Sequence, residues 1–119
     1  MRTLATVYQG DKDLRKHMSK GNCWEMQKHE LLYMKQFIDS YKGKPKFGIN
    51  WSNTLTHDDA NLLFHADEDF LTFFQENQKK LENSFIILVG DHGMRFGSVS
   101  QTTLGKREIK NPLLQITVP

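Results

Sequence analysis

A short apolar run passes directly into an acid and an imidazole near the middle of the second half of the chain. Residues 85–89 read Phe-Ile-Ile-Leu-Val and are followed by Gly90-Asp91-His92-Gly93. Such a run predicts a strand buried on both faces, as in a parallel sheet covered by helices. Asp91 and His92 would then stand at the carboxyl end of the strand, where open α/β sheets bind ligands. A carboxylate beside an imidazole suits a divalent metal.

Two stretches have the apolar period of amphipathic helices. Residues 24–41 repeat apolar side chains every three or four positions, and Gly43 and Pro45 then end the pattern. Residues 58–81 show the same spacing and predict one bent helix or two successive helices. The side chains expected to face the core are Tyr33, Met34, Phe37, Ile38 and Tyr41 in the first stretch, and Leu63, Ala66, Phe70, Phe73, Phe74 and Leu81 in the second.

The order of the remaining segments predicts an α/β fold with a mostly parallel sheet flanked by helices. Residues 46–51 alternate large apolar side chains with small or polar ones, which is typical of a strand. A strand at 46–51, a helix at 58–81 and a strand at 84–89 form a right-handed crossover unit with parallel strands. Residues 94–111 are polar and contain glycines, so we expect a long active-site loop. Residues 113–118 predict a last short strand.

Composition limits the classes of function. The 119 residues correspond to one domain or less, and 38% hydrophobic with 25% charged residues is ordinary for a globular protein. The net charge of +2 and the scattered lysines argue against nucleic acid as a partner. No apolar run approaches the roughly 20 residues of a membrane span. The lone Cys23 cannot form an internal disulfide, and a packed side chain explains it more simply than a catalytic thiol.

A second polar cluster, His57-Asp58, follows the strand expected at 46–51 after a short polar loop. If that strand is parallel to the one ending at Asp91-His92, both clusters lie at the same sheet edge. A shared metal or anion site is then geometrically possible. Capping residues and solvated charges explain the same residues equally well, and Asp58 at a helix start is a typical cap. The residues alone leave both interpretations open.

A series of motifs occurs in order along the chain: Cys23 before His29-Glu30, Lys-Pro-Lys-Phe at 44–47, Trp51-Ser52 with Leu-Thr-His-Asp-Asp at 55–59, a helix with paired aromatics between Ala66 and Phe74, and Asp-His-Gly-x-Arg-Phe-Gly at 91–97 with Gly-x-x-Glu ending at Glu108. In these motifs the sequence resembles the sulfatase-like domain of unknown function of animal, especially nematode, extracellular proteins. That domain belongs to the alkaline phosphatase and sulfatase superfamily. The resemblance covers residues 23–119, about four-fifths of the chain.

The resemblance implies a metal-dependent hydrolase or transferase acting on sulfate or phosphate esters. It assigns Asp91 and His92 as ligands of a divalent metal, Zn, Mn or Ca. It suggests that His57 contacts the transferred sulfo or phospho group, and that Arg95 and, less directly, Lys106 help to neutralise that anion. The residue types suit these roles, since imidazole donates a proton to a leaving oxygen and guanidinium binds anions in bidentate fashion. The resemblance also implies an extracellular protein.

Other superfamily features are not recognisable in this sequence. Residues 1–22 contain no nucleophile motif and no early metal-binding Asp, and Trp-Glu-Met-Gln follows Cys23 in place of the sulfatase Cys-x-Pro-x-Arg motif. Residues 1–20 also lack the apolar segment of a signal peptide. We therefore expect an irregular or weakly helical segment at 1–22 and a partial domain at 23–119, not catalytically competent alone. A non-catalytic extracellular binding protein that keeps the fold, and a small intracellular α/β module in which Asp91-His92 is incidental, remain as alternatives. The sequence leaves the oligomeric state open.

Overall fold

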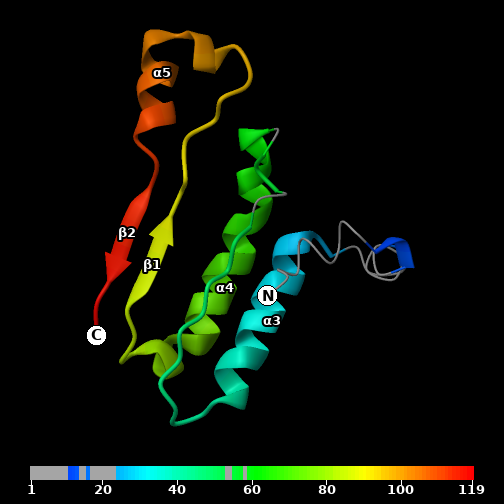
Figure 1. The fold of residues 1–119 in the computed structure, drawn as a ribbon, viewed down its shortest axis with the longest axis vertical. Helices are drawn as coiled ribbons and strands as arrows, with labels where there is room; N and C mark the ends of the chain where they lie inside the picture. The colour runs from blue at the N-terminus through cyan, green and yellow to red at the C-terminus, as the bar shows by residue number, and fades with distance from the viewer. Residues whose placement is uncertain (1–10, 14–15, 17–23, 53–54, 58) are drawn as a thin grey trace. The chain divides into compact units, whose positions relative to one another are not determined.

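The computed structural model describes residues 11–13, 16, 24–52, 55–57 and 59–119. The chain divides into two compact units, residues 1–54 and residues 55–119. The elements with described bounds, drawn in Figure 1, are α3 (Met26–Ser40), η1 (Ala60–Leu62), α4 (Leu63–Leu81), β1 (Ile86–Val89), η2 (Val99–Gln101), α5 (Thr103–Lys110) and β2 (Leu114–Thr117). The mixed helix-and-strand class predicted from the sequence is therefore confirmed in its general form. Cys23 and Asp58 lie outside the described residues.

Helix α3 confirms the helix expected at 24–41, but its buried face is displaced from the predicted one. Ile38 is buried as expected, whereas Tyr33 and Tyr41 are exposed. The buried row instead passes through Gln27, Glu30, Leu31 and Ile38. These positions follow the three- and four-residue spacing of a helix face. The sequence prediction selected the aromatic residues, and the helix buries two polar side chains in their place.

The end of α3 is closed by the chain that follows it. Gly43 adopts a left-handed conformation with φ 66°, which a glycine takes without steric cost. The Lys46 ammonium donates hydrogen bonds to the carbonyl oxygens of Tyr41 at 2.7 Å and of Lys44 at 3.1 Å. Carbonyl groups at a helix C-terminus lack partners within the helix, so a lysine that reaches back stabilises this end.

The strand expected at 46–51 does not form in the structure. The segment has no strand pairing, and Phe47, Ile49 and Trp51 are exposed, Phe47 by 86%. The Gly48 Cα approaches α3 closely, because an added Cβ would lie 3.2 Å from the Met34 sulfur. Alternation of side chains favours an extended backbone, but a strand also needs a neighbouring backbone to pair its N–H and C=O groups. The sequence pattern contains the first requirement and not the second.

Helix α4 confirms the helix expected at 58–81, as a short 3₁₀ turn followed by one helix. Ala66 is buried as predicted, whereas Leu63 at the start of the helix is exposed. Asn77 is fully buried in the same stripe. Its side-chain amide donates to the Phe73 carbonyl oxygen at 2.8 Å, so the buried polar group keeps a hydrogen bond.

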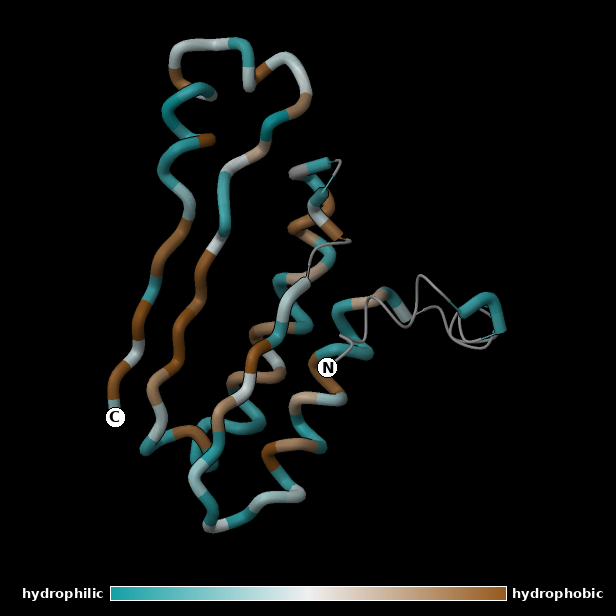
Figure 2. Tube along the Cα trace, in the orientation of Figure 1, coloured by the Kyte–Doolittle hydropathy of each residue, from teal (hydrophilic) through white to brown (hydrophobic). Residues whose placement is uncertain are grey.

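Strands β1 and β2 form a two-stranded antiparallel sheet, in which Ile86 pairs with Thr117 and Val89 with Leu114. Both strands occur where the sequence predicted them, and they are the most hydrophobic part of residues 85–119 in Figure 2. The parallel pairing and two-sided burial expected for β1 are not found among the described residues. The chain reverses direction between the two strands, so β2 returns antiparallel to β1. Ile87 and Val89 are exposed on one face.

The segment expected to be a long loop, residues 94–111, contains η2 and the eight-residue helix α5. Thr102 caps α5, because its hydroxyl oxygen accepts a hydrogen bond from the Gly105 N–H at 3.0 Å. Asn111 closes the other end by donating from its side chain to the Arg107 carbonyl oxygen at 2.7 Å, and Pro112 follows. The loop prediction was wrong because it gave more weight to the glycines of this segment than to Thr102 and Asn111, the residues that cap the helix. Among the helices of the described residues, none combines the length and apolar composition needed to cross a membrane.

Candidate metal and anion site

The turn after β1 is held on both sides by the chain that leads into β2. The Gly90 N–H donates to the Leu113 carbonyl oxygen at 2.9 Å, and the Gly93 N–H donates to the Ile109 carbonyl oxygen at 3.1 Å. A Cβ on Gly93 would lie only 2.5 Å from the Glu108 carbonyl oxygen, so the close approach requires glycine. Residues 91 and 92 stand between these two anchors, which fixes the backbone that carries their side chains.

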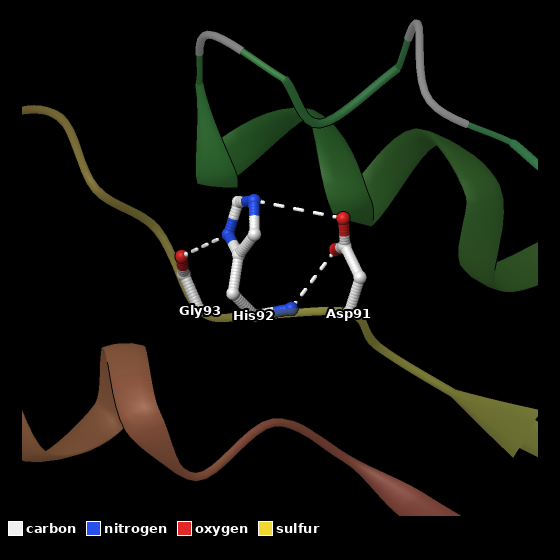
Figure 3. Close-up of polar contacts among 3 residues, drawn as sticks. All are labelled: Asp91, His92 and Gly93. Atoms are coloured by element: carbon white, nitrogen blue, oxygen red, sulfur yellow. Dashed lines mark hydrogen bonds and ion pairs between the residues drawn. The ribbon is translucent and has the colours of Figure 1, made fainter.

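The Asp91 and His92 side chains are oriented by hydrogen bonds within the turn, shown in Figure 3. Asp91 Oδ1 accepts from the His92 backbone N–H at 2.9 Å. His92 Nδ1 lies 2.8 Å from the Gly93 carbonyl oxygen. A carbonyl oxygen only accepts, so this hydrogen bond assigns the proton to Nδ1 and, in the neutral ring, leaves the lone pair on Nε2.

The remaining pair of atoms, His92 Nε2 and Asp91 Oδ2, lie 3.6 Å apart. That separation is too long for a hydrogen bond. It is close to the roughly 3.4 Å expected between two ligand atoms that each bind Zn²⁺ at about 2.0–2.1 Å in a tetrahedral site. The side chains are 37% exposed for His92 and 62% for Asp91, so both are accessible to an ion from solvent.

Asp91 and His92 are the two predicted metal ligands, and the described part of the chain brings their side chains together. Among the described residues, no group of three or more His, Cys, Asp or Glu side chains is placed to hold a metal. A divalent ion at Asp91 and His92 would therefore take its other ligands from water, from a substrate anion or from groups outside the described residues.

His57 lies beside the loop that follows the Asp91–His92 turn. Its ring centroid is 6.1 Å from that of Phe96, and the two ring planes are tilted by 47°. The structure thus brings the predicted His57 to the loop of the second cluster, although not by the parallel strands that the sequence suggested. The contact is made through Phe96, which the sequence reasoning did not select as a site residue. The sequence feature that could have identified Phe96 is its position next to Arg95 in the Asp-His-Gly-x-Arg-Phe-Gly motif at 91–97.

Arg95 and Lys106 are exposed, Arg95 in the loop and Lys106 on α5. No hydrogen bond or ion pair joins either side chain to Asp91 or His92 within the described residues. Both side chains are accessible from solvent. Their role in binding an anion stays a prediction.

Comparison with known proteins identifies a family. The family described as "Protein of unknown function (DUF229)" matches residues 1–119, the whole of the sequence. No curated protein matches the chain. No solved structure matches it. The chain belongs to the DUF229 family of proteins of unknown function.

Proposed function

We propose that the turn at Asp91 and His92 binds a divalent metal, and that the domain belongs to the metal-dependent hydrolases or transferases of sulfate and phosphate esters. The observation that carries the metal site is the separation of His92 Nε2 and Asp91 Oδ2, 3.6 Å, between two exposed side chains. The hydrogen bond from His92 Nδ1 supports it, since metal-binding histidines commonly donate their second ring N–H to a carbonyl oxygen or carboxylate.

The proposed chemistry divides between the metal and the polar side chains of this chain. A bound divalent ion would neutralise charge on the transferring group and activate a nucleophile. His57 would donate a proton to the leaving oxygen. Arg95, and Lys106 with it, would bind the equatorial oxygens of the sulfo or phospho group, a task suited to the planar guanidinium. The resemblance of the motifs supports these assignments.

The finer fold and the location of the protein are parts of the same proposal. The motif resemblance supports an alkaline-phosphatase-like α/β fold with a mostly parallel sheet, and an extracellular protein. A parallel neighbour on the edge of β1 that faces away from β2 would protect the backbone N–H groups of that edge from exchange with solvent. Amide hydrogen exchange therefore tests the fold proposal, and rapid exchange of every β1 amide that does not pair with β2 would contradict it.

Metal titration tests the site. Isothermal titration calorimetry of the purified chain with Mn²⁺ and Zn²⁺ is expected to show binding. Asp91→Asn and His92→Ala are each expected to weaken it by roughly 10-fold or more, because even the loss of a residue that only hydrogen-bonds to a metal ligand has an effect of that size. The matched controls are Asp67→Asn and His65→Ala, two exposed positions of the same residue types on α4. Both controls are expected to bind like the unsubstituted chain.

The outcomes separate the proposals. Equal affinities in all four variants would show that Asp91 and His92 hold no metal, which favours the interpretation of an α/β module in which the pair is incidental. Metal binding without turnover of aryl sulfate or aryl phosphate esters, in the longest available form of the protein, would favour a non-catalytic binding protein that keeps the fold. Turnover that Asp91→Asn and His57→Ala abolish would support the ester hydrolase.

A further inference from the structure

We propose that Phe96 is a positioning residue that orients the His57 imidazole toward the anion-binding side of the site. This inference rests on the proposed function, because it concerns the same His57. It assigns a role to a residue that the chemistry of the site does not require. The juxtaposition that carries it is the tilted contact between the two rings, with centroids 6.1 Å apart.

The geometry of this contact favours an orienting role. Aromatic rings in tilted arrangements attract one another through their quadrupoles, with centroids at 4.5–7 Å, so the contact favours particular ring orientations. Phe96 is 54% exposed and His57 is exposed as well, so the contact joins two rings that both remain accessible from solvent.

The loop that carries Phe96 is anchored at both ends. At its start, the Gly93 N–H donates to the Ile109 carbonyl oxygen at 3.1 Å. At its end, the hydroxyl of the buried Ser100 donates to the Gly97 carbonyl oxygen at 2.8 Å. Gly97 has φ 86°, a left-handed conformation that turns the chain directly after Phe96. The anchors limit the movement of Phe96, and a restrained ring orients its neighbour better than a mobile one.

The same anchors connect the two parts of the proposed site. Gly93 follows His92 directly, and Phe96 lies three residues further along the same restrained loop. The backbone that positions the metal-binding pair therefore also positions the ring that contacts His57. Phe96 thus brings His57, from the segment before α4, into contact with the loop that follows the Asp91–His92 turn, although the two segments are distant in the sequence.

Nuclear magnetic resonance of the metal-free chain tests the contact. The His57 ring protons are expected to carry ring-current shifts that Phe96→Ala and Phe96→Leu remove and Phe96→Tyr retains, since leucine keeps apolar bulk without a ring. The matched control is Phe85→Ala, because Phe85 is a 71% exposed phenylalanine that directly precedes the first residue of β1. Unchanged His57 signals in Phe96→Ala would overturn the inference.

Titration of the metal-free chain with inorganic phosphate, followed at the His57 signals, tests the positioning role. Phe96→Ala is expected to weaken phosphate binding by about 2- to 10-fold, the effect of one aromatic contact, and Phe96→Tyr to restore it. Equal affinity in Phe96→Ala, or no response of His57 to phosphate in the unsubstituted chain, would overturn the role. Manganese binding at Asp91 and His92 is expected to be unchanged in Phe96→Ala. His57 signals that do not change in Phe96→Ala, with manganese binding intact, would therefore refute this inference and leave the proposed function standing, whereas absence of metal binding at Asp91 and His92 in the unsubstituted chain would refute the proposed function itself.

Discussion

At the scale of single residues, the site depends on a glycine as much as on its polar side chains. Gly93 lets the turn approach α5 so closely that a Cβ would lie 2.5 Å from the Glu108 carbonyl oxygen and 2.8 Å from its carbonyl carbon. Both are backbone atoms, which cannot move aside as a flexible side chain can. The orientation of Asp91 and His92 therefore depends on the absence of a side chain next to them.

We predict that Gly93→Ala destabilises the chain by about 1–3 kcal/mol, the usual cost of forcing additional atoms into a packed site. It should also break the hydrogen bond from the residue 93 N–H to the Ile109 carbonyl oxygen. Urea unfolding measures the first effect and amide exchange the second. Gly97→Ala serves as the comparison, because an added Cβ meets nothing within 4 Å and the strain comes from φ alone. If the residue 93 amide is protected from exchange as well in Gly93→Ala as in Gly97→Ala, the prediction is wrong.

At the scale of elements, α5 shows how a short helix depends on its cap. The helix has eight residues, too few to be stable in isolation. The Thr102 hydroxyl accepts from the Gly105 N–H at 3.0 Å and donates to the Val99 carbonyl oxygen at 2.7 Å. This one side chain therefore joins α5 to η2. The helix in turn supplies the Ile109 carbonyl oxygen that anchors the site turn.

We predict that Thr102→Ala lowers the free energy of unfolding by about 1 kcal/mol, the typical value of an N-cap. Thr102→Ser should retain most of the stability, because serine keeps the hydroxyl oxygen. Thr103→Ala, a change of the same type at the neighbouring exposed position, should have a smaller effect. Denaturant midpoints of the three variants measure the difference. If Thr102→Ala and Thr103→Ala prove equally destabilising, the capping role is wrong.

At the scale of the whole molecule, one buried carboxyl links stability to pH. Glu30 on α3 is only 5% exposed. Burial raises the pKa of its carboxyl above the ordinary value of 4.5, and a hydrogen bond from Ser52 opposes part of that rise. The folded chain therefore holds this proton more tightly than the unfolded chain. Between the two pKa values folding takes up a proton, so stability falls as the pH rises through that window.

We predict that the free energy of unfolding contributed by Glu30 is fully present below pH 4.5, is lost as the pH rises through the raised pKa, and is constant above it. Glu30→Gln should remove this dependence and leave the protein at least as stable at neutral pH, because the amide has no charge to desolvate. Urea unfolding from pH 4 to pH 8 measures the dependence. The exposed Glu82→Gln is the control. A dependence that persists unchanged in Glu30→Gln would contradict the assignment.

The sequence by itself determined the elements whose signals are local. Helical spacing located α3 and α4, and runs of apolar residues located β1 and β2. The position of Asp91 and His92 immediately after a strand was also readable, because chain order alone places them there.

Only tertiary structure decided which backbone each extended segment pairs with. The partner of β1 is β2 in antiparallel register, and residues 46–51 have the alternation of a strand without its pairing. Likewise, the contact of His57 with Phe96 joins segments distant in the chain. Periodicity reports which side chains share a face, whereas pairing and ring contacts depend on neighbours that the chain supplies only once it is folded.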